Sequence, residues 1–78
     1  MSEIRVPDDL WDGEKIPEGA LSSWLYADGE AVQAGSAVAT VMAEKTEYDV
    51  TSPAGGTLRI VIAEGEAVRL GQVIGKVE

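Results

Sequence analysis

The sequence contains no cysteine and no histidine among its 78 residues. The chain therefore has no thiol nucleophile, no histidine general base and no Ser–His triad. Zinc and copper sites of the usual kind are excluded as well, because their ligands are chiefly Cys and His. No disulfide can support the fold, so a small apolar core must hold it unaided.

Long apolar runs are also absent. No stretch approaches the roughly 18 residues that a membrane-spanning helix needs, and the N-terminus lacks the basic and apolar segments of a signal peptide. We therefore expect a cytoplasmic protein without a membrane partner. A chain of 78 residues predicts a single domain, residues 1–78. A domain of this size buries only roughly 60% of its unfolded-chain surface, which leaves little room for a catalytic cleft.

Positive charge is scarce, with six basic against fourteen acidic residues and a net charge of −8. Such a surface repels nucleic acid and favours partners with basic patches, although the charge can equally serve solubility. The acidic cluster Asp8, Asp9, Asp12 and Glu14 lacks the spacing of a calcium loop. We therefore expect neither a nucleic-acid partner nor a metal site.

An internal repeat determines the expected architecture. Residues 25–35 match residues 61–71 with an offset of 36 (61 − 25). The same offset relates turn and core positions elsewhere in the chain, namely Val38 to Ile74, Val41 to Val77, Pro17 to Pro53 and Gly19 to Gly55. Two matching halves predict a fold with pseudo-two-fold symmetry.

Each half carries the signals of β-structure. Short runs rich in Val, Ile, Leu and Thr are interrupted by turn residues such as Asp28-Gly29 and Glu64-Gly65. We predict an all-β fold, a flattened β-barrel or sandwich of two antiparallel four-stranded sheets. The expected strands are residues 4–6, 20–26, 30–32, 37–43, 47–51, 57–62, 66–68 and 73–77.

Lys45 lies between two of these strands, in an expected turn over residues 44–46. Subtracting 36 maps Lys45 onto Asp9 as its counterpart in the repeat. The two corners should therefore lie at opposite poles, with the Asp9 corner near the chain ends. An amine on a tight turn of a rigid domain is a good handle for a covalently attached cofactor. The alternative is a solvated lysine that pairs weakly with Glu44 and Glu47.

The order and spacing of several motifs resemble the lipoyl domains of the biotinyl/lipoyl attachment family over nearly the whole chain. The stretch 42–46, followed by Asp49-Val50, is similar to the modified-lysine segment of that family. The other matching motifs are Val6-Pro7-Asp8-Asp9-Leu10, Glu18-Gly19, Trp24-Leu25, the Gly-Glu-x-Val-x-x-Gly segment at 29–35, and the Ser-Pro-x-x-Gly turn at 52–56.

The resemblance implies a non-catalytic carrier domain, without catalytic residues, that bears lipoate amide-linked to Lys45. Glu44 and Thr46 would be the flanking residues read by the modifying enzyme. The implied partners are a lipoate ligase or lipoyl transferase, and the decarboxylase, acyltransferase and dihydrolipoyl dehydrogenase subunits of a 2-oxo acid dehydrogenase-type complex.

A biotin carrier of a carboxylase or decarboxylase is the main alternative, because biotinyl domains share the fold. Their usual Ala-Met-Lys-Met pattern differs from Glu44 and Thr46, which favours lipoate, although Met42 replaces a usual lipoyl glutamate and Ala43 matches the biotinyl pattern. An unmodified interaction module is a third hypothesis.

Several further residues enter as expectations. Trp24 and Leu25 should pack in or against the core. Trp11 either shapes partner choice or forms a half-buried lid over the edge of the core. Glu44, Glu47 and Asp49 are either read by the modifying enzyme and the partner enzymes or merely solvated.

Overall fold

The computed structural model describes residues 2–78, which form eight β-strands and no helix. No helix in this part of the chain is therefore long and apolar enough to cross a membrane. The strands are β1 (Ser2–Arg5), β2 (Gly19–Trp24), β3 (Ala31–Val32), β4 (Ala37–Ala43), β5 (Thr46–Thr51), β6 (Gly56–Ile60), β7 (Ala67–Val68) and β8 (Val73–Val77).

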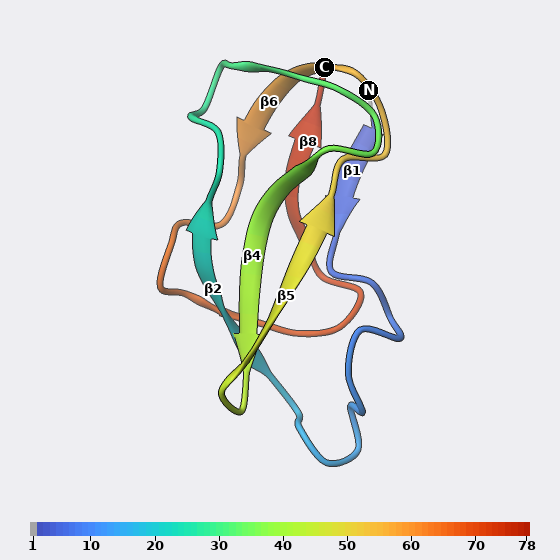
Figure 1. The fold of residues 1–78 in the computed structure, drawn as a ribbon, viewed down its shortest axis with the longest axis vertical. Coiled ribbons are helices and arrows are strands. Elements are labelled where there is room, and N and C mark those ends of the chain that lie inside the picture. Colours follow the sequence, from blue (N-terminus) through green and yellow to red (C-terminus); the bar gives the residue numbers. More distant parts are fainter. Residues whose placement is uncertain (1) are drawn as a thin grey trace.

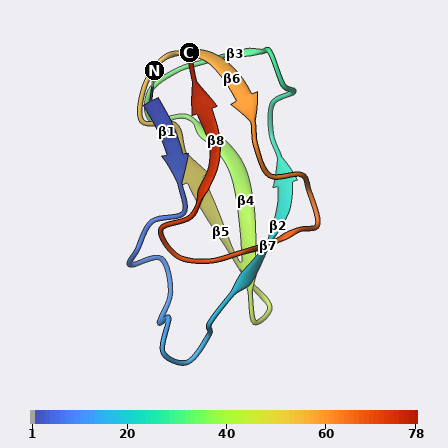
Figure 2. The ribbon, with the colours of Figure 1, turned by 180° about the vertical axis from the view of Figure 1, so that it is seen from behind.

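The strands form two four-stranded antiparallel sheets that pack face to face. One sheet has the order β1-β8-β6-β3 and the other the order β5-β4-β2-β7. Figure 1 shows the second sheet in front, and Figure 2 shows the first from behind. The edge strands β1 and β5 lie close together, but they belong to different sheets and are not paired with each other. The all-β prediction is confirmed, as a flattened sandwich rather than a closed barrel.

The pseudo-two-fold symmetry is confirmed by the strand orders. A shift of 36 residues carries β2 onto β6, β3 onto β7 and β4 onto β8, and the two sheet orders then correspond strand by strand. Alternating side chains point inward from both sheets. Together with Val6 and Trp11 from the connection between β1 and β2, they form one core composed of Ile4, Val6, Trp11, Leu21, Val32, Val38, Ala39, Val41, Ala43, Val50, Leu58, Val68, Ile74 and Val77.

Two carboxylates connect the halves across the pseudo-dyad. Asp28 Oδ1 accepts a hydrogen bond from the backbone N–H of Ile60 at 2.8 Å, and Glu64 Oε1 accepts one from the N–H of Trp24 at 3.2 Å. Donors and acceptors are each related by the 36-residue offset (60 − 24 and 64 − 28). Each acidic residue that precedes a turn glycine thus satisfies a backbone donor of the other half.

Arg59 lies beside Asp28, the first of these carboxylates, and adds ion pairs to the polar contacts between the halves. Its Nε donates to Glu78 Oε1 at 2.8 Å, and its Nη1 lies 3.8 Å from Asp28 Oδ2. The hydrogen bond that Arg59 donates to Glu78 raises the pKa of the guanidinium most, and the negative charges of Glu78 and Asp28 raise it further. All three side chains are about half exposed, so these ion pairs add little stability.

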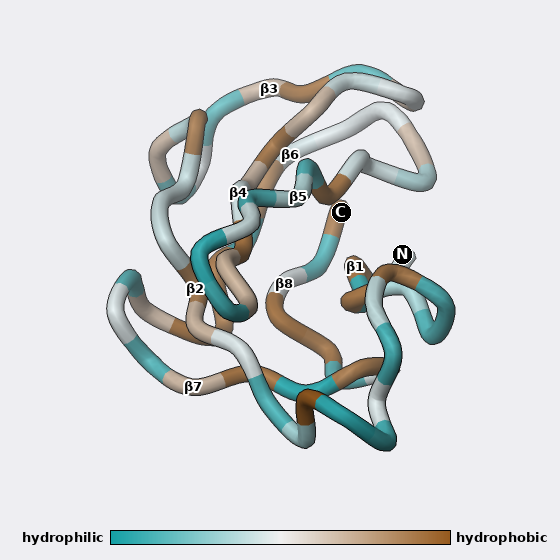
Figure 3. Tube along the Cα trace, turned by 60° about the horizontal axis from the view of Figure 1, so that its bottom comes forward, coloured by the Kyte–Doolittle hydropathy of each residue, from teal (hydrophilic) through white to brown (hydrophobic). Residues whose placement is uncertain are grey.

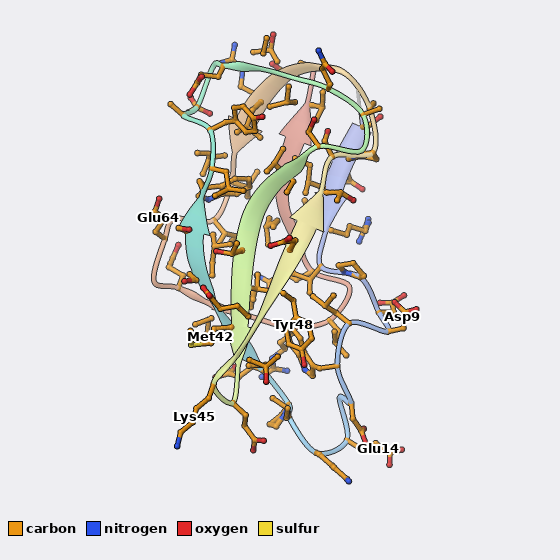
Figure 4. The ribbon with its side chains drawn as sticks, viewed as in Figure 1. Asp9, Glu14, Met42, Lys45, Tyr48 and Glu64 are labelled. Atoms are coloured by element: carbon orange, nitrogen blue, oxygen red, sulfur yellow. The ribbon has the colours of Figure 1, made fainter. Side chains whose placement is uncertain are left out.

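The expected equivalence of Lys45 and Asp9 was wrong. β4 corresponds to β8, and the neighbour of β8 in its sheet is β1, so the counterpart of the β4–β5 connection is the gap between the chain ends. Both termini lie at the end of the molecule opposite the β4–β5 hairpin, as Figure 1 shows. Asp9 lies in the β1–β2 connection, which has no symmetric partner. In Figure 4 Asp9 lies in the half of the molecule that holds Lys45 and away from the termini, so the expectation that its corner lies at the opposite pole, near the chain ends, was wrong as well.

Leu25 was also misplaced, since 51% of its surface is exposed. β2 ends at Trp24 rather than at residue 26, and β6 ends at Ile60 rather than at residue 62. The chain leaves each sheet at the equivalent point, which exposes Leu25 and, 36 residues later, Val61 at 52%. Trp24 does pack against the core, and its Nε1 donates to the carbonyl oxygen of Ile62 at 2.9 Å.

Candidate functional site: the lysine hairpin

β4 and β5 are joined by a two-residue turn, Glu44-Lys45. Ala43 pairs directly with Thr46, so Thr46 begins β5 and the predicted three-residue turn was one residue too long. Both turn residues have positive φ, 47° for Glu44 and 70° for Lys45. This is the pattern of a type I′ turn, whose twist matches that of the flanking strands.

The backbone of the turn is strained, because neither residue is glycine or asparagine. A left-handed conformation costs an L-residue with a Cβ roughly 1–2 kcal/mol. The long β4–β5 ladder holds the turn in place through six paired positions from Ala37↔Thr51 to Ala43↔Thr46. Strain of this kind persists where the surrounding structure over-determines the backbone, and it is concentrated at functional sites.

The side chain of Lys45 projects into solvent from the end of the sandwich. It is exposed, and Figure 4 shows it extending away from the body of the protein. In Figure 3 the hairpin tip is hydrophilic, whereas hydrophobic segments lie along the strands. Among residues 2–78 no hydrogen bond or ion pair engages its Nζ, and the weak pairing with Glu44 or Glu47 is not formed. The amine is therefore accessible to another protein.

The residues beside the lysine divide between the two faces of the hairpin. Glu44 and Thr46 are exposed at the tip. Met42 pairs with Glu47, and Thr40 with Asp49, so these side chains share the outer face of the sheet. Glu47, Asp49 and Met42 are exposed there, Met42 at 40%. Glu47 and Asp49 therefore form an exposed acidic surface beside Lys45.

Trp11 lies on the inner side of the hairpin, where it covers the edge of the core. Only 7% of its surface is exposed, and its Nε1 donates to the carbonyl oxygen of Ile16 at 2.9 Å. Its ring centroid lies 5.9 Å from that of Tyr48 in β5, with the planes inclined at 41°. The expectation that Trp11 covers the edge of the core is confirmed, and the indole is buried more deeply than the predicted half-buried lid.

The other two lysines lie in different settings. Lys15 belongs to the β1–β2 connection, and Lys76 lies within β8, paired with Glu3 and Arg59. No pocket opens in the surface formed by residues 2–78. The cluster Asp8, Asp9, Asp12 and Glu14 does not converge into a group suited to a metal ion in the described part of the chain.

A compact sandwich that displays a lysine on a hairpin has the geometry expected of a small β-carrier domain. The family model described as biotin-requiring enzyme, the biotin/lipoyl model, matches residues 2–77. The chain therefore belongs to the biotin/lipoyl attachment family.

Curated relatives of this chain include components of 2-oxo acid dehydrogenase complexes. A dihydrolipoyllysine-residue succinyltransferase component of the 2-oxoglutarate dehydrogenase complex from Staphylococcus saprophyticus is 35% identical over 78 residues, which is 99% of this chain. A lipoamide acyltransferase component of the branched-chain alpha-keto acid dehydrogenase complex from Bacillus subtilis is 37% identical over 67 residues, or 85% of this chain. The chain spans only 18% and 16% of these relatives.

The fold comparison leads to the same subclass. The solution structure of the lipoyl domain of the 2-oxoglutarate dehydrogenase complex from Azotobacter vinelandii matches with a TM-score of 0.76 and 26% identity. The match covers 100% of this chain and 96% of that domain. The resemblance to lipoyl carrier domains, proposed from the motifs, is thereby confirmed.

Two features of the site were missed from the sequence. The positive φ of Glu44 and Lys45 had no signal, because the usual Asn-Gly of such turns is absent. Trp11 and Tyr48 are 37 positions apart in the sequence (48 − 11), so their contact could not be predicted from local patterns. The one available signal was the presence of a tryptophan in a short polar segment.

Proposed function

We propose that this chain is a lipoyl carrier domain whose Lys45 Nζ is amide-linked to lipoate. The carrying observation is the hairpin itself, with an exposed amine on a turn that a six-pair ladder holds in a strained conformation. An enzyme that modifies a folded domain needs an amine it can reach and a backbone that presents it in one orientation. Glu44 and Thr46, exposed on either side, are the residues such an enzyme would read.

The residues around Lys45 suit this group. Lipoate supplies a dithiolane that takes up an acyl group together with two electrons, and the chain itself contains no cysteine. The hairpin fixes only the root of the arm, since no pocket among the described residues would retain the distal ring. Tethering to a small rigid domain raises the local concentration of the group near each partner active site.

The partners follow from this role. We infer that the domain serves a 2-oxo acid dehydrogenase-type complex, in which a decarboxylase loads the arm, an acyltransferase unloads it and a dihydrolipoyl dehydrogenase reoxidises it. A lipoate ligase or lipoyl transferase would attach the group. Relatives whose names place them in 2-oxoglutarate, branched-chain and pyruvate dehydrogenase complexes support this inference.

Biotin is the second candidate, because the family includes biotin carriers and Ala43 matches their pattern. The immediate flanks argue against it. Glu44 and Thr46 stand where biotinyl domains carry methionine, and both side chains are exposed where a modifying enzyme would bind.

Intact mass spectrometry tests these assignments. The chain is co-expressed with lipoate ligase or with biotin ligase, and Lys45→Arg serves as the variant that retains the positive charge. We expect a mass increase of one lipoyl group with lipoate ligase, loss of that increase in Lys45→Arg, and peptide mapping that excludes Lys15 and Lys76. Addition of biotin alone would favour the second candidate. Absence of both groups would leave an unmodified interaction module.

A further inference from the structure

Trp11 is buried at the base of the lysine hairpin, although the core offers other places where an indole could be buried. It is the only aromatic residue in the connection between β1 and β2, where six of the thirteen residues are charged. Its indole is buried and packs at the base of the lysine hairpin, against Tyr48. Figure 4 shows that Glu14, from the same connection, lies at the same end of the molecule as Lys45.

Several contacts join the connection, β2 and the hairpin at this point. The indole Nε1 donates to the carbonyl oxygen of Ile16, which closes the connection on itself. At Gly19, the first residue of β2, a Cβ atom would stand 3.2 Å from Trp11 Cη2 and 2.6 Å from the carbonyl oxygen of Met42. The same Cβ would be 3.4 Å from that of Ala43. Trp11 thus packs against Tyr48 of β5 on one side and against Gly19 of β2 on the other. Gly19 in turn lies against the backbone of β4 at Met42.

We propose that Trp11 is a positioning residue for Lys45. By packing against Tyr48 and Gly19, it holds the base of the hairpin in a single orientation and thereby presents the amine to the modifying enzyme. Trp11 acts through the base of the hairpin, and none of its contacts is with the amine. The inference rests on the proposed function for its enzymatic consequence, but its structural part stands on the unmodified domain.

The chain offers a matched control in Trp24. Its Nε1 also donates to a backbone carbonyl oxygen, that of Ile62, at 2.9 Å, and its ring also packs against a glycine, Gly75. Trp24 pairs with Ala39, four residues before Ala43 along β4 and about 13 Å from the start of the turn at the rise of a strand. Replacing either tryptophan removes the same groups, but only Trp11 lies at the hairpin.

The first experiment compares amide hydrogen exchange in the unmodified wild type, Trp11→Leu, Trp11→Phe and Trp24→Leu. Urea unfolding first establishes that each variant folds and how far it is destabilised. We expect residues 43–48 to exchange about tenfold faster in Trp11→Leu than its global destabilisation accounts for. Trp11→Phe, which keeps an aromatic ring beside Tyr48, should restore most of the protection. Equal protection of residues 43–48 in Trp11→Leu and Trp24→Leu, at matched global stability, would overturn the proposal.

The second experiment measures the kinetics of lipoylation by lipoate ligase on the same variants. A hairpin that is correctly oriented only part of the time has a lower apparent affinity, because only that fraction binds. We expect KM for Trp11→Leu to rise about threefold or more with kcat unchanged, and Trp24→Leu to retain the wild-type KM. A fall in kcat at constant KM would contradict a positioning role. If the wild type accepts no lipoate, the proposed function fails, while the exchange experiment still decides whether Trp11 orders the hairpin.

Discussion

The strained turn makes a prediction that concerns stability rather than modification. Glu44 is held at a φ of 47° in the first central position of a two-residue turn. Asparagine adopts this conformation more readily than glutamate, because its short polar side chain hydrogen-bonds to the local backbone. We therefore expect Glu44→Asn to stabilise the domain.

The magnitude follows from the cost of the left-handed conformation. An L-residue loses roughly 1–2 kcal/mol there, and asparagine should recover about half of that, or about 0.5–1 kcal/mol. In a domain of this size each kcal/mol raises Tm by about 4–8 °C. The side chain of Glu44 is exposed and makes no ion pair among residues 2–78, so little opposes the gain.

Urea denaturation followed by tryptophan fluorescence measures the change in the free energy of unfolding, with the m-value as a check that the two-state transition is preserved. Glu47→Asn is the matched control. It removes the same charge from the same hairpin, but it lies in β5, where asparagine is disfavoured. If Glu44→Asn were no more stable than Glu47→Asn, the turn would not be strained at this position and the argument from φ would fail.

Three further predictions test the scaffold and the flanks. Gly56→Ala should lower the free energy of unfolding, measured by urea denaturation, by more than about 3 kcal/mol, because the φ of Gly56 is 154° and a Cβ would collide with the carbonyl oxygen of Glu78. Gly35→Ala should lower it by only about 1–2 kcal/mol, because Gly35 has a φ of 84° but lies in open space. Asp28→Ala should lower the free energy of unfolding by about 1 kcal/mol, because the hydrogen bond from the Ile60 N–H is lost. Most of this loss should persist in high salt, and Asp28→Asn, which keeps an acceptor oxygen, should lose less stability. The double variant Glu44→Met with Thr46→Met should increase biotinylation of Lys45 by biotin ligase, measured by intact mass. No gain would mean that these flanking residues do not select the cofactor.

The architecture was largely readable from the chain. The 36-residue repeat and the regular turn residues predict two matched four-stranded sheets, and β4 and β8 have the predicted bounds. Strand ends were less predictable at Leu25, because an apolar residue next to Trp24 continues the strand pattern although the backbone already leaves the sheet. The mapping of Lys45 onto Asp9 failed because the repeat is interrupted by the chain ends.

The sequence by itself determined the class of structure, the absence of Cys and His chemistry, and the location of a lysine between two strands. These are local properties, since they depend on composition, on turn residues and on the period of apolar side chains. The tertiary structure alone decided that the turn has two residues with positive φ, that Trp11 packs on Tyr48, and that Asp28 and Glu64 bind across the pseudo-dyad. Each of these depends on ladder closure or on contacts between distant segments, and such contacts exist only once both sheets have packed together.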